Sequence, residues 1–528
     1  MNTSDQLEGQ FLPARFVIVS WTDFLEKGRT FRYTIVAVAL SIFISLIISN
    51  VNKIKAPYIG YRSFLEPTFW LRLRFMFEAR VMVEDGYRKF RDSMFVVRRM
   101  DTDMLIISNK YIEELRTIPH SKLGAIDALQ KNMGKFTTTE IALDGDLHIR
   151  VLQAKLTPNL GKISDIIQDE ADFGIETEVP KSEEWTEINI EGILQRLIAR
   201  ITARVFVGLP VCRDEEWLTA SIDYTLNVFM TAFILRRFPT ILHPLLARVL
   251  PTWYRLHRNL RVAKKIIYPM IQDHLEKGAA GESGKEQPTL LNWMVDIASG
   301  NERVPAKLVS RQMILTIASI NTTTMGLAHA IYDLCAHPEY LAPIREEIAE
   351  VLAQDQGIKK ETLPKLRKMD SLLRESQRFG PPSIISFQRV AKVPITLSDG
   401  TFLPRGTHLA CAASSLQHDP TIVPNPEVFD PFRWERKRLS AESEINKHRF
   451  VMTDKNNLNW GHGRDACPGR FFASTEMKMI LVRLLMGWEF KFKEGEGRPR
   501  NFMLDDNIFL DSSARVLIRK RKAGEQSV

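Results

Sequence analysis

The sequence predicts a mainly α-helical protein with a minor β region, preceded by a single N-terminal transmembrane helix. Three observations lead to this fold class: one uncharged apolar run near the N-terminus, long apolar patterns at helical spacing, and few strand-like segments. The 528 residues are 45% hydrophobic and 26% charged, which is ordinary for a globular protein and sufficient for a core. Length alone allows several domains. Because no internal repeat or convincing linker divides the chain, we expect one body after the membrane helix.

The first predicted element is a membrane anchor at 33–51, after a short tail at 1–32. The run from Tyr33 to Ser49 contains no charge and is just long enough to cross a bilayer, which takes about 17 to 25 residues. A cleaved signal peptide is one alternative, but the run starts far from the N-terminus and no small-residue cleavage site follows it. A buried core helix is another, although nothing polar marks an outer face. We therefore expect an uncleaved anchor.

Residues 52–60 are predicted to form a hinge, and 61–528 the globular body. Pro57 interrupts any helical continuation from the anchor. Basic residues flank the anchor on both sides, so the distribution of positive charge does not settle its orientation. The four cysteines form no close pair and no Cys-x-x-Cys motif, which favours a reducing compartment over a disulfide framework. This places the body on the cytosolic side.

The charge balance argues against nucleic-acid binding. Lys and Arg number 72 against 63 Asp and Glu, which gives a net charge of +9. The excess is spread along the chain, without a basic run interleaved with aromatic residues. A basic surface that meets an acidic membrane or an acidic redox partner explains it better, and a merely solvated surface is the plainer alternative.

The longest predicted helix starts near Pro305, a favourable first-turn residue, and ends at about Ala336, before His337-Pro338. Its centre, residues 318–324, reads Ala-Ser-Ile-Asn-Thr-Thr-Thr, a run of poor helix formers. Hydroxyl groups there can bond to carbonyls one turn back and bend the helix. By itself this run indicates a tolerated kink.

Other elements are expected on both sides of this helix. A second helix begins near Leu366 and ends at Gly380-Pro381-Pro382. Strands are expected at 104–108, 395–397 and 516–518, and residues 276–288 read as a mobile surface loop between helices of one domain.

The most informative segment is a glycine-rich turn at 460–473 that leads into a helix, Trp-Gly-His-Gly-Arg-Asp-Ala-Cys-Pro-Gly-Arg-Phe-Phe-Ala. Tight folding around Cys467 would direct peptide N–H groups at its sulfur, and the N-terminal end of the helix would add positive potential. Both effects lower a cysteine pKa. A lone intracellular cysteine is more often a small buried apolar residue. The spacing of the surrounding glycines favours a thiolate ligand.

This spacing resembles the haem-binding signature of the cytochrome P-450 superfamily, aromatic-x-x-Gly-x-x-x-Cys-x-Gly. The resemblance implies haem b with iron ligated by Cys467, in a loop formed by Trp460, Gly461, Gly463, Arg464 and Gly469. Trp460 replaces the usual Phe, and we expect it to tune the iron through its added N–H donor. Asp465 replaces a basic residue that in the family faces a haem propionate, and we hypothesise that Arg464 covers that charge.

The run at 318–324 then resembles the oxygen-activation motif of the same superfamily. Thr322 matches its first threonine, and its implied role is to hydrogen-bond dioxygen and help deliver protons for O–O cleavage. Asn321 replaces the usual acid. A proton relay must therefore use water, Thr323 or another path.

Two further motifs fit the family. Glu375 and Arg378 lie three residues apart on one helix face, and Arg433 in a Phe-x-Pro-x-Arg-like element would complete a structural cluster behind the cysteine loop. Arg389 matches a position that commonly pairs with a haem propionate. The family's Trp-x-x-x-Arg pair is not recognisable, and His148, Arg150 and Lys155 are candidate substitutes. The cluster alone could be a surface ion pair, and Arg389 alone an exposed arginine.

Short matches along the chain, such as Gly60-Tyr61-Arg62-Ser63, resemble the fungal membrane-bound branch related to ent-kaurene oxidase. This implies a microsomal enzyme of the endoplasmic reticulum that hydroxylates or multiply oxidises a diterpene, meroterpenoid or indole-diterpene in secondary metabolism. It would use O2 and electrons from NADPH through NADPH-cytochrome P-450 reductase, since no flavin or nucleotide motif is present. Arg464, Arg470 and Lys478 are candidates for the docking face. The implied apolar substrate pocket includes the uncharged residues Ala318, Ile384, Ile385 and Phe509.

Two other functions are kept open. A haem-thiolate isomerase or dehydratase, which needs neither O2 nor a reductase, would explain Asn321, but the presence of Thr322 argues against it. A non-catalytic, membrane-anchored haem or lipid carrier would explain the anchor but would not need Thr322.

Overall fold

The computed structural model describes residues 55–280, 287–359 and 361–522. Residues 56–528 group into one compact unit, and the described residues belong to it apart from Lys55. The predicted tail, the anchor at 33–51 and the first part of the hinge lie outside the described residues, as do positions 281–286 of the predicted loop. That loop also starts later than expected, because the helix before it continues to Ala279.

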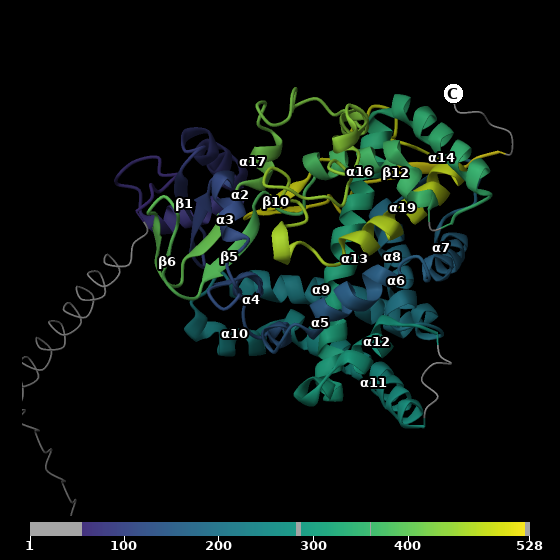
Figure 1. The fold of residues 1–528 in the computed structure, drawn as a ribbon, viewed down its shortest axis with the longest axis horizontal. Helices are drawn as coiled ribbons and strands as arrows, with labels where there is room; N and C mark the ends of the chain where they lie inside the picture. Colours follow the sequence, from purple (N-terminus) through teal and green to yellow (C-terminus); the bar gives the residue numbers. More distant parts are fainter. Residues whose placement is uncertain (1–54, 281–286, 360, 523–528) are drawn as a thin grey trace, which may run out of the picture. The chain divides into compact units, whose positions relative to one another are not determined.

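The described body is mainly helical, as predicted (Figure 1). Its α-helices are α2 (Thr68–Lys89), α3 (Ile112–Leu115), α4 (Ala125–Met133), α5 (Leu147–Val151), α6 (Thr157–Asn159), α7 (Ser164–Glu178), α8 (Ile190–Phe206), α9 (Glu215–Leu235), α10 (His243–Val249), α11 (Pro251–Ala279), α12 (Leu290–Ile297), α13 (Pro305–Ala336), α14 (Leu341–Asp355), α15 (Thr362–Lys365), α16 (Arg367–Phe379), α17 (Ala413–Gln417), α18 (Arg433–Leu439) and α19 (Arg470–Gly487). A short π-helical turn (Leu152–Leu156) and several 3-10 turns connect them.

The predicted long helix is α13, and its two ends agree with the prediction. Pro305 stands in the first turn, where its missing N–H is not needed, and His337 leaves helical geometry before Pro338. Figure 1 shows α13 passing through the middle of the body, with α14, α16 and α19 towards one end. Most of its side chains are buried. The helix therefore organises the core around it.

The strands are short and more numerous than predicted. They are β1 (Met94–Arg98), β2 (Asp103–Ile107), β3 (Leu123–Gly124), β4 (Thr186–Ile188), β5 (Ser386–Ala391), β6 (Ile395–Thr396), β7 (Phe402–Leu403), β8 (His408–Cys411), β9 (Trp488–Lys491), β10 (Phe502–Leu504), β11 (Asn507–Phe509) and β12 (Val516–Lys520). Three of them, β2, β6 and β12, correspond to the predicted segments. Of the others, all except β1 and β5 have four residues or fewer, which is too short to give a recognisable alternating pattern.

The largest sheet has the order β1-β2-β8-β5-β3. Strands β2 and β8 run parallel, and the other pairs are antiparallel. Arg389 of β5 lies opposite Leu409 of β8, after a register shift between Ser386 and Arg389. This sheet therefore fixes the backbone that carries one of the predicted site residues.

Two apolar cores support these elements. The larger joins α7, α8, α9, α11, α13, α16 and α19. The smaller lies between α2, β1, β2 and β8 and includes Ile384, Ile385 and Ile508. The cysteine turn precedes α19, whose apolar residues enter the larger core, so its position depends on that core.

A buried ionic cluster ties the end of α9 to two turns of the sheets. Arg99 is fully buried and bonds to Asp101 (Nε to Oδ1, 3.0 Å). Asp101 is 3.6 Å from Arg236 Nε, and Asp505 is 3.0 Å from Arg237 Nη2. Because these carboxylates and guanidinium groups are shielded from solvent, separating them is costly.

Apolar side chains are exposed at two places on the body. One group precedes and begins α2, and the other follows α9 and includes α10. These groups contain Phe64, Leu65, Phe69, Trp70 and Phe77, and Phe238, Ile241, Leu242, Leu245 and Val249, with exposed fractions from 42% to 95%. By length and composition, α9 and α13 are also apolar enough to span a membrane. Their apolar windows are 56% and 61% buried, as in core helices of globular proteins.

Candidate functional site

The cysteine turn is closed by glycines in left-handed geometry. Gly461 and Gly463 have φ of +70° and +73°. A Cβ at Gly463 would lie 2.8 Å from Cβ of Arg116, and one at Gly461 would lie 3.0 Å from the carbonyl oxygen of Asp465. The turn is fastened by the Cys467 N–H, which donates to the carbonyl of Trp460 at 2.7 Å. Both glycines are therefore required by the fold of the turn.

The sulfur of Cys467 lies in the predicted peptide cradle. Hydrogen bonds from the N–H groups of Gly469 and Arg470, together with the Arg470 guanidinium, act to lower the thiol pKa. Burial has the larger effect and raises the pKa of Cys467 above its ordinary value. The turn therefore acts on this pKa in the expected direction, but burial outweighs it in the protein alone. A cation at the sulfur would reverse the balance, because metal coordination deprotonates a thiol.

Trp460 packs beside the turn, but its N–H group is already used. The indole Nε1–H donates to the carbonyl of Phe450 at 2.9 Å, and the two rings meet edge to face with centroids 5.3 Å apart. The expected tuning of the site by an additional donor from Trp460 does not fit this geometry. The indole instead fixes the segment that precedes the turn.

Asp465 is held by the side chains of Arg389 and His120. Its Oδ2 lies 2.9 Å from Arg389 Nη2, and its Oδ1 lies 2.7 Å from His120 Nε2. Arg389 is 5% exposed, and burial lowers its pKa while the Asp465 carboxylate raises it. Arg389 and His120, and not the neighbouring Arg464, therefore pair with Asp465. The hypothesis that Arg464 covers the charge of a propionate stays a prediction. No motif pointed to His120, which lies far from Asp465 in the sequence.

The basic residues proposed for partner docking differ in exposure. Lys478 is 4% exposed and its ammonium group pairs with Asp370 inside the core, so it cannot form part of a docking face. Arg470 is half-buried and donates to the carbonyls of Val451 and Cys467 at 3.1 and 2.7 Å. Arg464 is exposed.

The centre of α13 is open on one face. Ala318 and Thr322 are exposed, although Ile320 and Thr323 between and beside them are 1% and 4% exposed. The Thr322 hydroxyl donates to the carbonyl of Ala318 at 2.8 Å. Hydroxyl bonding to the preceding turn, expected for this run, is thus present. Asn321 points elsewhere, since its Oδ1 accepts from Gln195 Nε2 of α8 at 3.2 Å.

These features fit an iron porphyrin. The donor is a soft cysteine sulfur surrounded by peptide N–H groups, and its thiolate form is of the kind that holds haem iron. The buried Nη2 of Arg389 makes no well-aligned hydrogen bond despite its proximity to Asp465, so it retains capacity for another anion such as a propionate. His148, a candidate second partner, is 6% exposed with Nδ1 unpaired, and burial lowers its pKa to about 4. Arg150 is engaged by Asp146 and Glu302.

Glu375, Arg378 and Arg433 meet in one buried cluster. Arg378 and Arg433 donate to the carboxylate at 2.8 Å (Nη2 to Oε1) and 3.2 Å (Nε to Oε1). The indole N–H of Trp434 donates to Oε2 at 2.9 Å, and the backbone N–H of Asp430 to Oε1 at 3.2 Å. Both guanidinium groups also bond to backbone carbonyls, including that of Val428. A segment far along the chain is thereby fastened to α16.

The four predicted pocket residues differ in exposure. Ala318 and Phe509 are exposed, Phe509 at 41%. Ile384 and Ile385 are 1% and 2% exposed and pack in the smaller core with Ile508. Their assignment to a substrate pocket stays a prediction.

Comparison with known proteins gives a consistent result. A family model described as cytochrome P-450 matches residues 85–517. A cytochrome P-450 monooxygenase of Emericella nidulans is 47% identical over 94% of this chain and 93% of its own. The monooxygenase olcJ of Penicillium canescens is 44% identical over 94% and 95%, and an ent-kaurene oxidase of Fusarium fujikuroi is 40% identical over 91% of each chain.

Proposed function

This chain belongs to the cytochrome P-450 family of haem-thiolate monooxygenases, and from that premise we propose that it oxidises an apolar terpenoid in fungal secondary metabolism. The observation that supports the substrate class is its 40% identity, over 91% of both chains, to an ent-kaurene oxidase. The proposed substrate is a diterpene, meroterpenoid or indole-diterpene. The reaction is hydroxylation or a sequence of oxidations at one carbon.

In this proposal Cys467 ligates the iron, and the neighbouring N–H groups share the negative charge of its sulfur. When bound, haem would supply the oxidising chemistry, and Cys467 would hold it through its sulfur. Arg389 orients the group by pairing with a propionate. Thr322 would offer its hydroxyl oxygen on the exposed face of α13, while its proton is donated to the carbonyl of Ala318.

Electrons must come from another protein. The sequence contains no flavin or nucleotide motif, so the proposed donor is NADPH-cytochrome P-450 reductase. Arg464 is the member of the predicted basic set that is exposed beside the cysteine turn, and we place it in the docking face.

The function is tested by co-expressing the full chain with a fungal reductase and with enzymes that form candidate terpenes, including ent-kaurene. We expect an oxygenated product that requires NADPH, reductase and O2, and whose added oxygen derives from labelled O2. A rearranged or dehydrated product formed without O2 would instead indicate the isomerase or dehydratase. Binding of the terpenoid without any turnover would indicate a carrier.

The proposed location is the endoplasmic reticulum membrane, with the body in the cytosol. The uncharged run at 33–49 supports an anchor, and the exposed apolar groups before α2 and at α10 support additional contact of the body with lipid.

Deleting residues 1–56 is expected to convert the protein from an integral to a peripheral membrane protein, because the remaining apolar contacts lie on the surface of the body. The full chain should stay with membranes after carbonate extraction, whereas the truncated chain should be released. A full-length Leu40→Arg/Ile44→Arg variant serves as the comparison, since it removes the apolar character without shortening the chain. Carbonate resistance of both altered proteins would contradict an N-terminal anchor.

A further inference from the structure

A buried polar network joins α8, α13 and α19 next to the open centre of α13. The Thr202 hydroxyl of α8 lies 3.1 Å from Glu476 Oε1 of α19 and 3.0 Å from Ser319 Oγ of α13. Glu476 is 0% exposed and Thr202 is 2% exposed. Thr202 thus bridges a carboxyl group and a hydroxyl group that belong to different helices.

Glu476 is a buried carboxyl group without a charged partner among the residues that the structure describes. Its Oε2 has no hydrogen-bond partner there, and its only bonding group is the Thr202 hydroxyl. Burial raises the pKa of Glu476 to about 8, against the opposing effect of the Thr202 hydrogen bond. The carboxyl therefore carries its proton at neutral pH, because an unpaired carboxylate in this position would be strongly destabilised.

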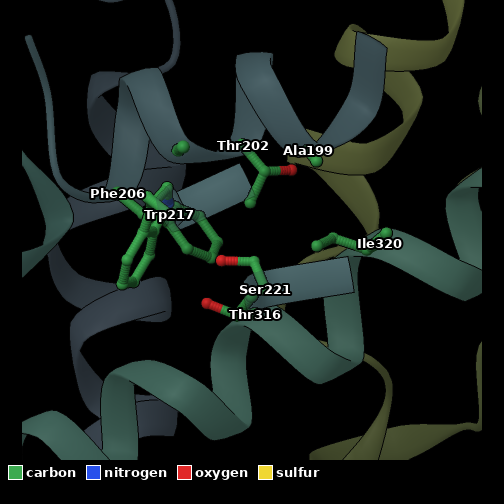
Figure 2. A pocket seen from close by; sticks show the side chains of 8 residues that line it. Ala199, Thr202, Phe206, Trp217, Ser221, Thr316 and Ile320 are labelled. Atoms are coloured by element: carbon green, nitrogen blue, oxygen red, sulfur yellow. The ribbon is translucent and has the colours of Figure 1, made fainter. Parts of the chain in front are cut away.

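Beside this network, Thr202 lines a small cavity with Ser221, Thr316 and Ile320, seen in Figure 2, and this cavity has no room for a water molecule. Among the described residues, the hydrogen bonds that lead from Glu476 to α13 run through the Thr202 hydroxyl. The Thr316 hydroxyl donates to the carbonyl of Gln312, within its own helix, and offers no alternative.

At the other end of the path, Ser319 lies two residues before Asn321 and three before Thr322. Ser319 is half-buried, whereas its neighbour Ile320 is 1% exposed, so the serine lies between the core and the open face. Asn321 stands where related proteins have an acid, and its amide is engaged by Gln195. An amide does not release a proton at neutral pH. This chain thus lacks an acid at position 321. It has another acid, Glu476, that is connected to α13 near this turn through the hydroxyl groups of Thr202 and Ser319.

We propose that Glu476 is a proton-supplying positioning residue that acts through Thr202 and Ser319 on the Asn321–Thr322 turn of α13. In the structure the Thr202 hydroxyl donates to Glu476 Oε1, so the carboxyl proton must first turn towards Thr202 and the hydroxyls must reverse. Glu476 then passes its proton to Thr202 Oγ1 as Thr202 passes its own to Ser319 Oγ, and Ser319 releases one to an acceptor on the open face. Only O–H bonds change, and no electrons are transferred. The remaining carboxylate recovers a proton from solvent at the open face, through the same groups in reverse. The inference rests on the proposed function, because reduction of O2 is the step that consumes these protons.

The first measurement follows electron use in the full-length holoenzyme with reductase, NADPH and ent-kaurene as probe. Glu476→Gln keeps the size of the side chain but carries no transferable proton. We expect this variant to release more hydrogen peroxide per NADPH consumed and to show a larger solvent deuterium isotope effect. The rate of product formation from NADPH should fall roughly tenfold. Thr202→Val should have the same effect, and Thr202→Ser should restore the wild-type values. Thr322→Ala, which removes the last hydroxyl, is the positive reference.

The second measurement separates proton supply from a packing defect. An organic hydroperoxide brings an O–O bond that is already reduced and protonated, so turnover driven by it should be nearly unchanged in Glu476→Gln. The matched control is Thr316→Val, which removes a buried hydroxyl of α13 outside the network and should behave as wild type in both assays. Equal loss with NADPH and with hydroperoxide would overturn the proposal in favour of a structural role.

The third measurement is independent of turnover. The infrared difference spectrum between wild type and Glu476→Gln should contain a protonated-carboxyl band that shifts in D2O, and a spectrum without this band would overturn the proposal. The proposed function would fail if the wild-type protein forms no product containing oxygen from O2 with ent-kaurene or with the other candidate terpenes. The inference itself would fail if the wild type is active and Glu476→Gln directs as large a share of its NADPH electrons into product as the wild type does.

Discussion

Replacing Cys467 by Ala is expected to abolish haem-thiolate ligation. The side chain is the only thiol in the turn, and the surrounding N–H groups of Gly469 and Arg470 would have no anion to stabilise. The carbon monoxide difference spectrum of the reduced protein should lose the band of thiolate-ligated haem, and NADPH-driven oxidation should fall to background. The effect should be nearly complete, since no other cysteine lies near this position in the sequence.

The matched control is Cys335→Ala in α13, which also removes a free thiol but lies outside the turn. Its spectrum should match that of the wild type, because alanine suits a helix interior. A thiolate band that persists in Cys467→Ala, or a wild-type band typical of histidine ligation, would refute Cys467 as the ligand.

Replacing Glu375 by Gln is expected to cause the largest loss of stability. The carboxylate is fully buried and is the shared acceptor of two guanidinium groups, of which that of Arg378 is also fully buried. Gln preserves the size but leaves both cations without a countercharge, and breaking a buried pair of this kind costs about 3–5 kcal/mol. Thermal unfolding of the haem-loaded protein should shift to markedly lower temperature, and less folded protein should be recovered.

Glu84→Gln provides the comparison. Its partner Arg80 is 3.9 Å away and both side chains are more than a third exposed, so the substitution should change stability by about 0.5 kcal/mol or less. If Glu375→Gln unfolds at the same temperature as Glu84→Gln, the cluster does not hold the segment from Asn425 to Trp434 as proposed. A normal thermal profile with altered electron uptake would instead assign the cluster to partner binding.

Much of the helical fold could be predicted because helix signals are local. Pro305 and His337-Pro338 mark the two ends of α13 through the residues at those ends alone. The hydroxyl-rich centre of the helix predicted hydrogen bonds to carbonyls one turn back, and Thr322 makes such a bond to Ala318. The sheets could not be read in the same way. Strands β3, β6 and β7 have two residues each, and their pairing is determined by partners distant in the chain.

The candidate site, too, could be predicted only where its features depend on residues close together in the sequence. The spacing around Cys467 and the three-residue separation of Glu375 and Arg378 were legible in the sequence. The pairing of Asp465 with Arg389 and His120 was not, because it joins three segments by tertiary packing. The same holds for Glu476, which is one of several polar residues in the first half of α19. Its isolation from any countercharge becomes visible only when α8 and α13 are placed against it.

The ionic cluster at the end of α9 has a consequence for protein engineering. Arg236 and Arg237 fasten this end of the helix to Asp101 and Asp505, whereas the exposed apolar group that follows α9 begins at Phe238. The ionic contacts and this apolar group therefore lie in adjacent but separate stretches. The segment from Phe238 to Leu250 can then be exchanged with that of a relative while the two arginines stay in place. Such chimaeras would vary the exposed apolar surface without altering the salt bridges that hold α9 to the sheets.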